Sequence, residues 1–234
     1  MKKPTSRHKC AAGCALALFS APLAHAAGDG ELGILDTFGT NPATGVEWAV
    51  GDTYHLIFVT TGTTDATSNA ITDYNAFVQG DADSQTGAFA NMGNVNWFAL
   101  GSTETTDAID NAVITAPVVG AFDSGAVAVD ASDFWDFSFP DPNPINQLDG
   151  TDKNVWTGTA AGGTADSGDE LGATNGETRR HWTGWTDWGP ANANQANSDL
   201  REMVAISQEL TVVPESSAAL LIGVAGLALL RRRR

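Results

Sequence analysis

Tyr54-His55-Leu56-Ile57-Phe58-Val59-Thr60 is a β-branched and aromatic run bounded by Asp52 and Gly62. Such a run between turn-forming residues is typical of a central β-strand. The Gly- and Thr-rich residues 27–53 before it contain only scattered apolar residues and predict an irregular lead-in. The globular domain is therefore expected over residues 54–212 of this 234-residue chain.

The residues after this strand predict one helix and a series of strands. Helical spacing of apolar residues predicts an amphipathic helix over residues 70–79 that ends before Gly80. The residues with this spacing are Ile71, Tyr74, Phe77 and Val78. Further strand-like runs occupy, in chain order, residues 95–100, 118–122, 126–129, 155–159, 203–207 and 210–212. We expect a single α+β domain that is rich in strands and has one or two small helices.

The charge of the chain excludes several classes of partner. The formal net charge is −16, and basic residues crowd both ends of the chain. Of the 28 acidic residues only Glu215 lies outside residues 27–213, so 27 carboxylates face four basic residues there, a difference of −23. Such a polyanion repels nucleic acid and anionic lipid head groups. Both cysteines, Cys10 and Cys14, precede residue 27, so the domain is expected to depend on an apolar core.

Residues 1–26 indicate a signal peptide. A basic segment is followed by an apolar run over residues 11–23 and by the small-x-small site Ala24-His25-Ala26. Signal peptidase is expected to cut before Ala27. The domain is therefore predicted to work outside the cytoplasm.

Residues 213–234 have the features of a removable membrane tail. Pro214 and Glu215 precede an apolar helix expected over residues 218–230. Thirteen helical residues span only about 20 Å, less than the roughly 30 Å hydrocarbon core, so the helix is a poor permanent anchor. The positive-inside rule predicts that the terminal basic residues stay cytoplasmic and leave the domain on the other side. These residues are Arg231, Arg232, Arg233 and Arg234.

This tail, with Val213-Pro214-Glu215-Ser216 at its start, resembles the PEP-CTERM sorting signal of Gram-negative bacteria. Ser216 stands where the family has a second proline. The resemblance implies transient insertion in the inner membrane and cleavage near Pro214 and Glu215 by a membrane-embedded exosortase. It also implies delivery to the cell surface or to secreted polysaccharide, often in biofilm-forming bacteria.

Two motifs in the domain support a second resemblance. The segment Trp97–Thr103 has the form Trp-x-Ala-x-Gly-Ser-Thr, and Val155–Thr159 is Val-Trp-Thr-Gly-Thr. With the opening strand, the helix, the Asp149-Gly150 turn and the last strand, their order resembles the endostatin branch of the C-type-lectin-like fold. The chain is also similar to a group of PEP-CTERM proteins that pair these two motifs. These resemblances imply a fold over about residues 54–210, but no activity.

The sequence shows no pattern typical of catalysis. His55 and His181 are the only histidines after residue 26, and neither lies in a recognisable motif. We expect His55 within the opening strand and His181 in a solvated loop. Without a base at a suitable spacing, neither a hydrolytic triad nor a zinc site is predicted. No catalytic residue is therefore predicted.

Two acidic segments contain oxygen ligands of the kind that calcium prefers. One includes Asp81 and Asp83, and the other includes Asp149 and Asp152. Both are expected in loops, and neither has the Gly and Glu positions of the helix-loop-helix calcium site. Asx turns are the favoured interpretation, so no cofactor is expected, with calcium as the alternative.

Trp182, Trp185 and Trp188 recur at intervals of three, and Asn192 follows them. Three indoles so spaced could form a platform for sugar rings. Packing in the core is favoured, because buried tryptophan is common and its N–H usually finds a local partner. Both interpretations stay open.

The sequence thus predicts a non-enzymatic, exosortase-processed surface protein with a structural or adhesive role in an extracellular matrix. Its expected partners are signal peptidase and exosortase during export, and extracellular polysaccharide afterwards. A carbohydrate-binding module, with or without calcium, is the first alternative. A secreted hydrolase is the second.

Overall fold

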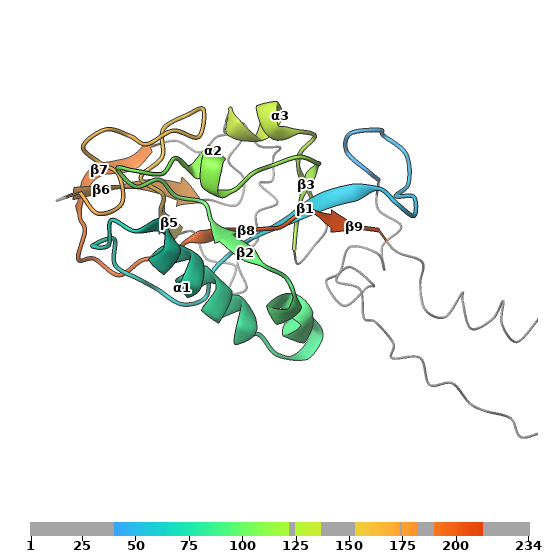
Figure 1. Cartoon of the computed structure of the whole chain (residues 1–234), viewed down its shortest axis with the longest axis horizontal. Coiled ribbons are helices and arrows are strands. Elements are labelled where there is room, and N and C mark those ends of the chain that lie inside the picture. Colours follow the sequence, from blue (N-terminus) through green and yellow to red (C-terminus); the bar gives the residue numbers. More distant parts are fainter. Residues whose placement is uncertain (1–39, 122–124, 137–152, 174, 182–189, 213–234) are drawn as a thin grey trace, which may run out of the picture.

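The structure, a computed structural model, describes residues 40–121, 125–136, 153–173, 175–181 and 190–212 (Figure 1). It is a mixed α and β protein with an open sheet of six strands and few helices. The elements of the first half are β1 (Thr53–Val59), α1 (Ile71–Asp83), the 3₁₀ helix η1 (Gly87–Asn94), β2 (Trp97–Ala99), α2 (Ala108–Asn111), β3 (Val118–Gly120) and β4 (Ala126–Ala128). Those of the second half are α3 (Ala131–Trp135), β5 (Lys153–Trp156), β6 (Asn175–His181), β7 (Pro190–Ala196), β8 (Val204–Ser207) and β9 (Leu210–Thr211).

Strand β1 lies inside the main sheet, whose order is β2-β8-β1-β3-β4, with β9 also paired to β1. It runs parallel to β3 and antiparallel to β8 and β9. The strands β5, β6 and β7 form a second, antiparallel sheet. Trp156 of β5 joins the two sheets through a parallel bridge to Met203 and a 2.9 Å hydrogen bond from its N–H to the Glu202 carbonyl.

The apolar run of β1 is buried on both faces of the sheet. Leu56 and Phe58 belong to a core cluster that also contains residues of α1 and η1. Ile57 and Val59 belong to a second cluster with residues of α2 and α3. The two helix pairs accordingly lie on opposite sides of the sheet (Figure 1). This explains why the run is continuously apolar rather than alternating, and it confirms the predicted central strand.

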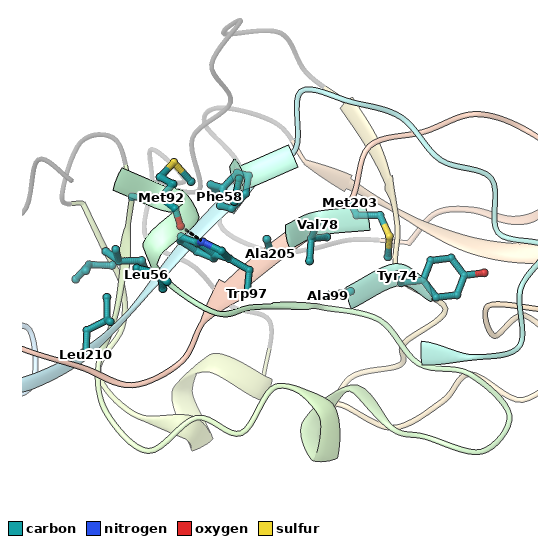
Figure 2. Packing of buried hydrophobic residues seen from close by; sticks show 14 of the residues in the cluster. Leu56, Phe58, Tyr74, Val78, Met92, Trp97, Ala99, Met203, Ala205 and Leu210 are labelled. Carbon is teal, nitrogen blue, oxygen red and sulfur yellow. Dashed lines mark hydrogen bonds between the residues drawn. The ribbon is translucent and has the colours of Figure 1, made fainter. Parts of the chain in front are cut away.

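Aromatic packing closes the core beneath α1 and η1. Figure 2 shows Phe58 beside Trp97 and Met92. The rings of Phe58 and Trp97 meet edge to face, with centroids 4.7 Å apart at 88°. The Trp97 Nε1–H donates to the Met92 carbonyl over 2.8 Å, so the buried indole keeps a polar partner.

Helix α1 confirms the predicted helix but extends past Gly80 to Asp83. Gly80 does not end the helix: it is not among the glycines with a positive φ, and it lies on the exposed side of α1. Asp81 and Ala82 directly after it are buried, and their packing holds the last turn in helical form. Three further short helices, η1, α2 and α3, exceed the one or two that were expected.

The outer edge of β2 is covered by side-chain amides rather than by another strand. The Gln79 Oε1 accepts from the Trp97 N–H at 2.9 Å, and the Asn75 Oδ1 accepts from the Ala99 N–H at 2.8 Å. Asn75 and Gln79 are four residues apart on α1, a rise of about 6 Å, and their partners are two residues apart on β2, a distance of about 6.6 Å. The spacing along the helix therefore matches the spacing along the strand. Asn111 of α2 completes the cover by donating to the Ala99 carbonyl at 2.8 Å.

The remaining strand predictions agree with the structure to within a few residues. Of the predicted irregular lead-in, residues 40–52 form turns and isolated bridges, and Thr53 begins β1. The strands β6 and β7 were not predicted from the sequence. Within the described ranges, no helix is long and apolar enough to cross a membrane.

We predict that Asn75→Ala lowers the free energy of unfolding by about 1–3 kcal/mol, because the Ala99 N–H and the Asn111 amide lose their partner. Urea denaturation with an unchanged m-value measures this. The control is Asn94→Ala, since Asn94 is exposed and its amide donates only to Asn91. Equal midpoints for the two variants would contradict the role of the amide cover.

Candidate functional site

The two motif segments Trp97–Thr103 and Val155–Thr159 meet in the structure. The Ser102 N–H donates to the Thr157 carbonyl over 2.8 Å, and the hydroxyls of Ser102 and Thr159 share a hydrogen bond of 2.9 Å. Four hydroxyl side chains gather there, and all are fully buried. We call Ser102, Thr103, Thr157 and Thr159 the Ser/Thr clasp.

The glycines of both motifs allow a third segment to approach the Ser/Thr clasp. A Cβ at Gly101 would lie 2.7 Å from the Leu171 Cδ1. Gly158 has a φ of +57°, and a Cβ there would lie 2.5 Å from the Leu171 nitrogen. The Leu171 N–H in turn donates to the Ser102 carbonyl over 2.9 Å. The motifs therefore fasten the connection between β5 and β6 to the main sheet.

The hydroxyls of the Ser/Thr clasp serve structure rather than nucleophilic chemistry. The Ser102 Oγ also accepts from the Ala108 N–H at 2.9 Å, and Thr159 Oγ1 donates to the Thr157 carbonyl at 2.8 Å. An activated nucleophile needs a base within hydrogen-bonding reach and an open approach for substrate. All four hydroxyls are buried. Those of Ser102, Thr157 and Thr159 are bonded to hydroxyl and backbone groups, and that of Thr103 has no hydrogen-bond partner among the described residues.

His55 is buried within β1, as expected of a strand residue. Its Nδ1 lies 2.9 Å from the Ser207 carbonyl, so it carries the proton, and its Nε2 accepts from the Thr115 N–H at 3.1 Å. The Thr115 hydroxyl donates to the carboxylate of Glu209. Burial lowers the pKa of His55, while the Ser207 carbonyl and Glu209 oppose that shift. Both ring nitrogens are engaged, and the imidazole is held in its neutral form.

The carboxylate of Asp81 pins the turn after β1. It accepts from the N–H and the hydroxyl of Thr61 at 3.1 and 2.9 Å, and from the Gly62 N–H at 2.8 Å. Asp83 is exposed and accepts from Gln79 at 2.9 Å. Both residues belong to α1, so their predicted placement in a loop is wrong: the buried Asp81 and Ala82 prolong the helix.

The other calcium candidates, Asp149 and Asp152, lie outside the described residues. Within the described part of the chain, no group of three or more His, Cys, Asp or Glu side chains could hold a metal ion. The carboxylates of Asp81 and Asp83 contact backbone, hydroxyl and amide groups, as in ordinary turns.

The tryptophans of the predicted sugar platform, Trp182, Trp185 and Trp188, also lie outside the described residues. Asn192 lies in β7 opposite Thr178 of β6. His181 is the last residue of β6, opposite Lys153, so its predicted placement in a loop is wrong because its backbone pairs with β5.

The predicted processing residues fall outside the described ranges as well. They are Ala24 and Ala26 of the predicted leader, and Pro214, Glu215, Arg231, Arg232, Arg233 and Arg234 of the predicted tail.

Residues 41–52, which we call the entry turn, hold the last described residue of the chain. The Gly51 N–H donates to the Val212 carbonyl at 2.9 Å, and the Val212 N–H donates to the Asp52 carbonyl at 2.8 Å. The Asp52 carboxylate closes the turn by accepting from the Ala49 N–H at 3.0 Å and from Asn41 at 3.1 Å. These two hydrogen bonds lower the pKa of Asp52. Sequence reasoning missed this arrangement, although Asn41 and Asp52 are typical turn residues.

Comparison with known proteins assigns no family. No protein-family model matches the chain, and no curated protein matches it. Function is therefore inferred from the chain itself, from its two ends and from the contacts of the described domain.

We predict that Gly158→Ala lowers the free energy of unfolding by about 1–3 kcal/mol, because the added Cβ meets the Leu171 backbone. Gly162→Ala is the matched control, since Gly162 also has a positive φ, +91°, but nothing within 4 Å of its Cβ position. Both variants place an alanine at a positive φ, but only Gly158→Ala adds a close contact. The difference between their denaturant midpoints therefore measures the cost of that contact. A Gly158→Ala midpoint at or above that of the control would refute the close approach.

The buried, neutral His55 predicts a loss of stability in mild acid. The unfolded chain takes up a proton as pH falls through the ordinary pKa of 6.5, whereas the folded protein resists protonation. Stability is therefore full above that pH and falls below it, with a slope of at most about 1.4 kcal/mol per pH unit for one proton. We expect the decrease between pH 7 and 5 to be smaller in His55→Gln, measured by urea denaturation. Parallel pH profiles would contradict the assignment.

Proposed function

We propose that this protein is exported, processed at its C-terminal tail by an exosortase, and retained at the cell surface or in extracellular polysaccharide. Its role there is structural or adhesive. The observation that carries the proposal is the tripartite tail, in which Pro214 and Glu215 precede an apolar segment and four arginines. The signal peptide at the other end supports export through the inner membrane.

The placement of the chain ends supports a tethered domain. The entry turn and Val212 are hydrogen-bonded to each other, so both terminal segments join the domain at one end. The strands β6 and β7 lie at the opposite end of the domain (Figure 1). A tail inserted in a membrane would thus hold one end of the domain and present the other end outward.

A non-enzymatic role agrees with the chemistry of the described residues. The hydroxyls of the Ser/Thr clasp are buried against backbone, and His55 uses both nitrogens for packing of β1. The strong negative charge of residues 27–213 favours solubility and attraction of cations over contact with nucleic acid. We propose extracellular polysaccharide as the partner in this role.

We further propose that the domain is of the endostatin type within the C-type-lectin-like fold. The order of β1, α1, β2 and the late strand β8 agrees with the order on which the resemblance rests. The contact between the motifs Trp97–Thr103 and Val155–Thr159 also supports it, because paired motifs are expected to meet in space.

Mass spectrometry of the protein isolated from its cells tests the proposal. We expect a chain that begins at Ala27 and ends near Pro214–Glu215, recovered mostly with the extracellular matrix. In cells without exosortase, or with Arg231 to Arg234 replaced by serine, the tail should persist and the protein should stay with the membrane. Recovery of matrix protein that retains the four arginines would exclude processing.

A further inference from the structure

The inference drawn here rests on the proposed membrane insertion of the tail. Val212 is the last described residue, and it is buried and hydrogen-bonded to the entry turn. Six Cα steps separate Val212 from Ala218, where the apolar run begins. A fully extended chain covers about 20 Å in six steps. An inserted tail therefore keeps the Val212 end of the domain within that distance of the hydrocarbon boundary.

The head-group region on each side of a bilayer is about 5–8 Å thick, from the difference between total and hydrocarbon thickness. Crossing the head groups takes up this part of the reach of about 20 Å, so the Val212 end of the domain stays within about 12–15 Å of the outer edge of the head groups. The entry turn is hydrogen-bonded to Val212 through Gly51 and Asp52, so it lies beside the point at which the chain passes from the described domain into the tail.

The entry turn exposes apolar side chains at this position. Val46 and Val50 are 64% and 65% exposed, among the most exposed large apolar residues in the described ranges. The turn is held in shape by the Asp52 carboxylate and by the edge-to-face contact of Trp48 with Tyr54, whose ring centroids are 5.6 Å apart. Two valines are thus presented by a braced turn rather than by a loose segment.

We infer that the entry turn is the lipid-facing surface of the tail-inserted protein, with Val46 and Val50 in contact with the head-group region of the bilayer. Two valines bury too little apolar surface to hold a domain of net charge −23 on a membrane alone. The contact therefore depends on the tail and ends when the tail is cut. Glu47 is exposed within the turn itself, beside Val46, so the surface proposed here suits an uncharged head-group region and not an anionic one. Carboxylates elsewhere on the domain are screened from the bilayer beyond a Debye length of about 8–10 Å.

Attachment of a fluorophore to single introduced cysteines tests this surface, because residues 27–234 contain no cysteine of their own. Val46→Cys and the control Leu200→Cys are made in the full chain and purified from cells without exosortase, where leader cleavage removes Cys10 and Cys14. Leu200 is 68% exposed but precedes β8, whereas the entry turn adjoins β9. Each labelled protein is reconstituted in phosphatidylcholine vesicles that carry a nitroxide on the head group.

We expect the fluorophore at residue 46 to be quenched at least two-fold more than the one at residue 200. Proteolytic removal of the tail should abolish the difference. Val50→Cys provides a second position if the first variant does not fold.

The possible failures are distinguishable by vesicle flotation. If the chain floats with the vesicles but the labels at residues 46 and 50 are quenched no more than that at residue 200, the lipid-facing surface is refuted and the proposed function stands. If the chain does not float, tail insertion itself is refuted, and with it both the proposed processing route and this surface.

Discussion

The structure depends on one constraint, the burial of β1 on both of its faces and the pairing of both of its edges. Leu56 and Phe58 face one core cluster while Ile57 and Val59 face the other. A strand buried in this way has no solvent face, so its backbone groups must find their partners within the protein, as the Leu56 N–H does by donating to the Ser207 hydroxyl at 2.8 Å. The parallel partner β3 and the antiparallel partners β8 and β9 supply them. The helices on the two sides then follow, because each apolar face needs a cover.

Burial of apolar residues also decides which elements could be predicted from the sequence. The run over residues 54–60 was predictable because a buried strand is continuously apolar, and α1 because its apolar residues recur at helical spacing. The strands β6 and β7 were missed because their sequences, Asn-Gly-Glu-Thr-Arg-Arg-His and Pro-Ala-Asn-Ala-Asn-Gln-Ala, contain no large apolar residue. Their pairing is set by the backbone and by neighbouring strands, which single-sequence patterns do not encode.

The Ser/Thr clasp shows why a motif was visible in the sequence while its purpose was not. Serine, threonine and glycine together also occur at sites of nucleophilic or phosphate chemistry, and only the contacts decide between them. Here Gly101 and Gly158 are required because the Leu171 segment passes within van der Waals distance of both. Ser102 ties the two motifs together through backbone and side chain. In a domain without cysteines, such buried hydrogen bonds take the place that a disulfide could have in fastening a long connection.

The entry turn supports the short strand β9. A strand of two residues is too short to stay paired through its own ladder, so its end must be held by other contacts. Burial of Leu210 and Val212 gives it apolar support, and the backbone bonds from Gly51 and to Asp52 extend the pairing by one residue. The Asp52 carboxylate braces the turn that makes those bonds, and it does so through N–H groups that it satisfies at the surface. The point at which the chain leaves the domain is therefore set by the fold itself. The proposed membrane insertion of the tail would therefore act on the domain at this one point.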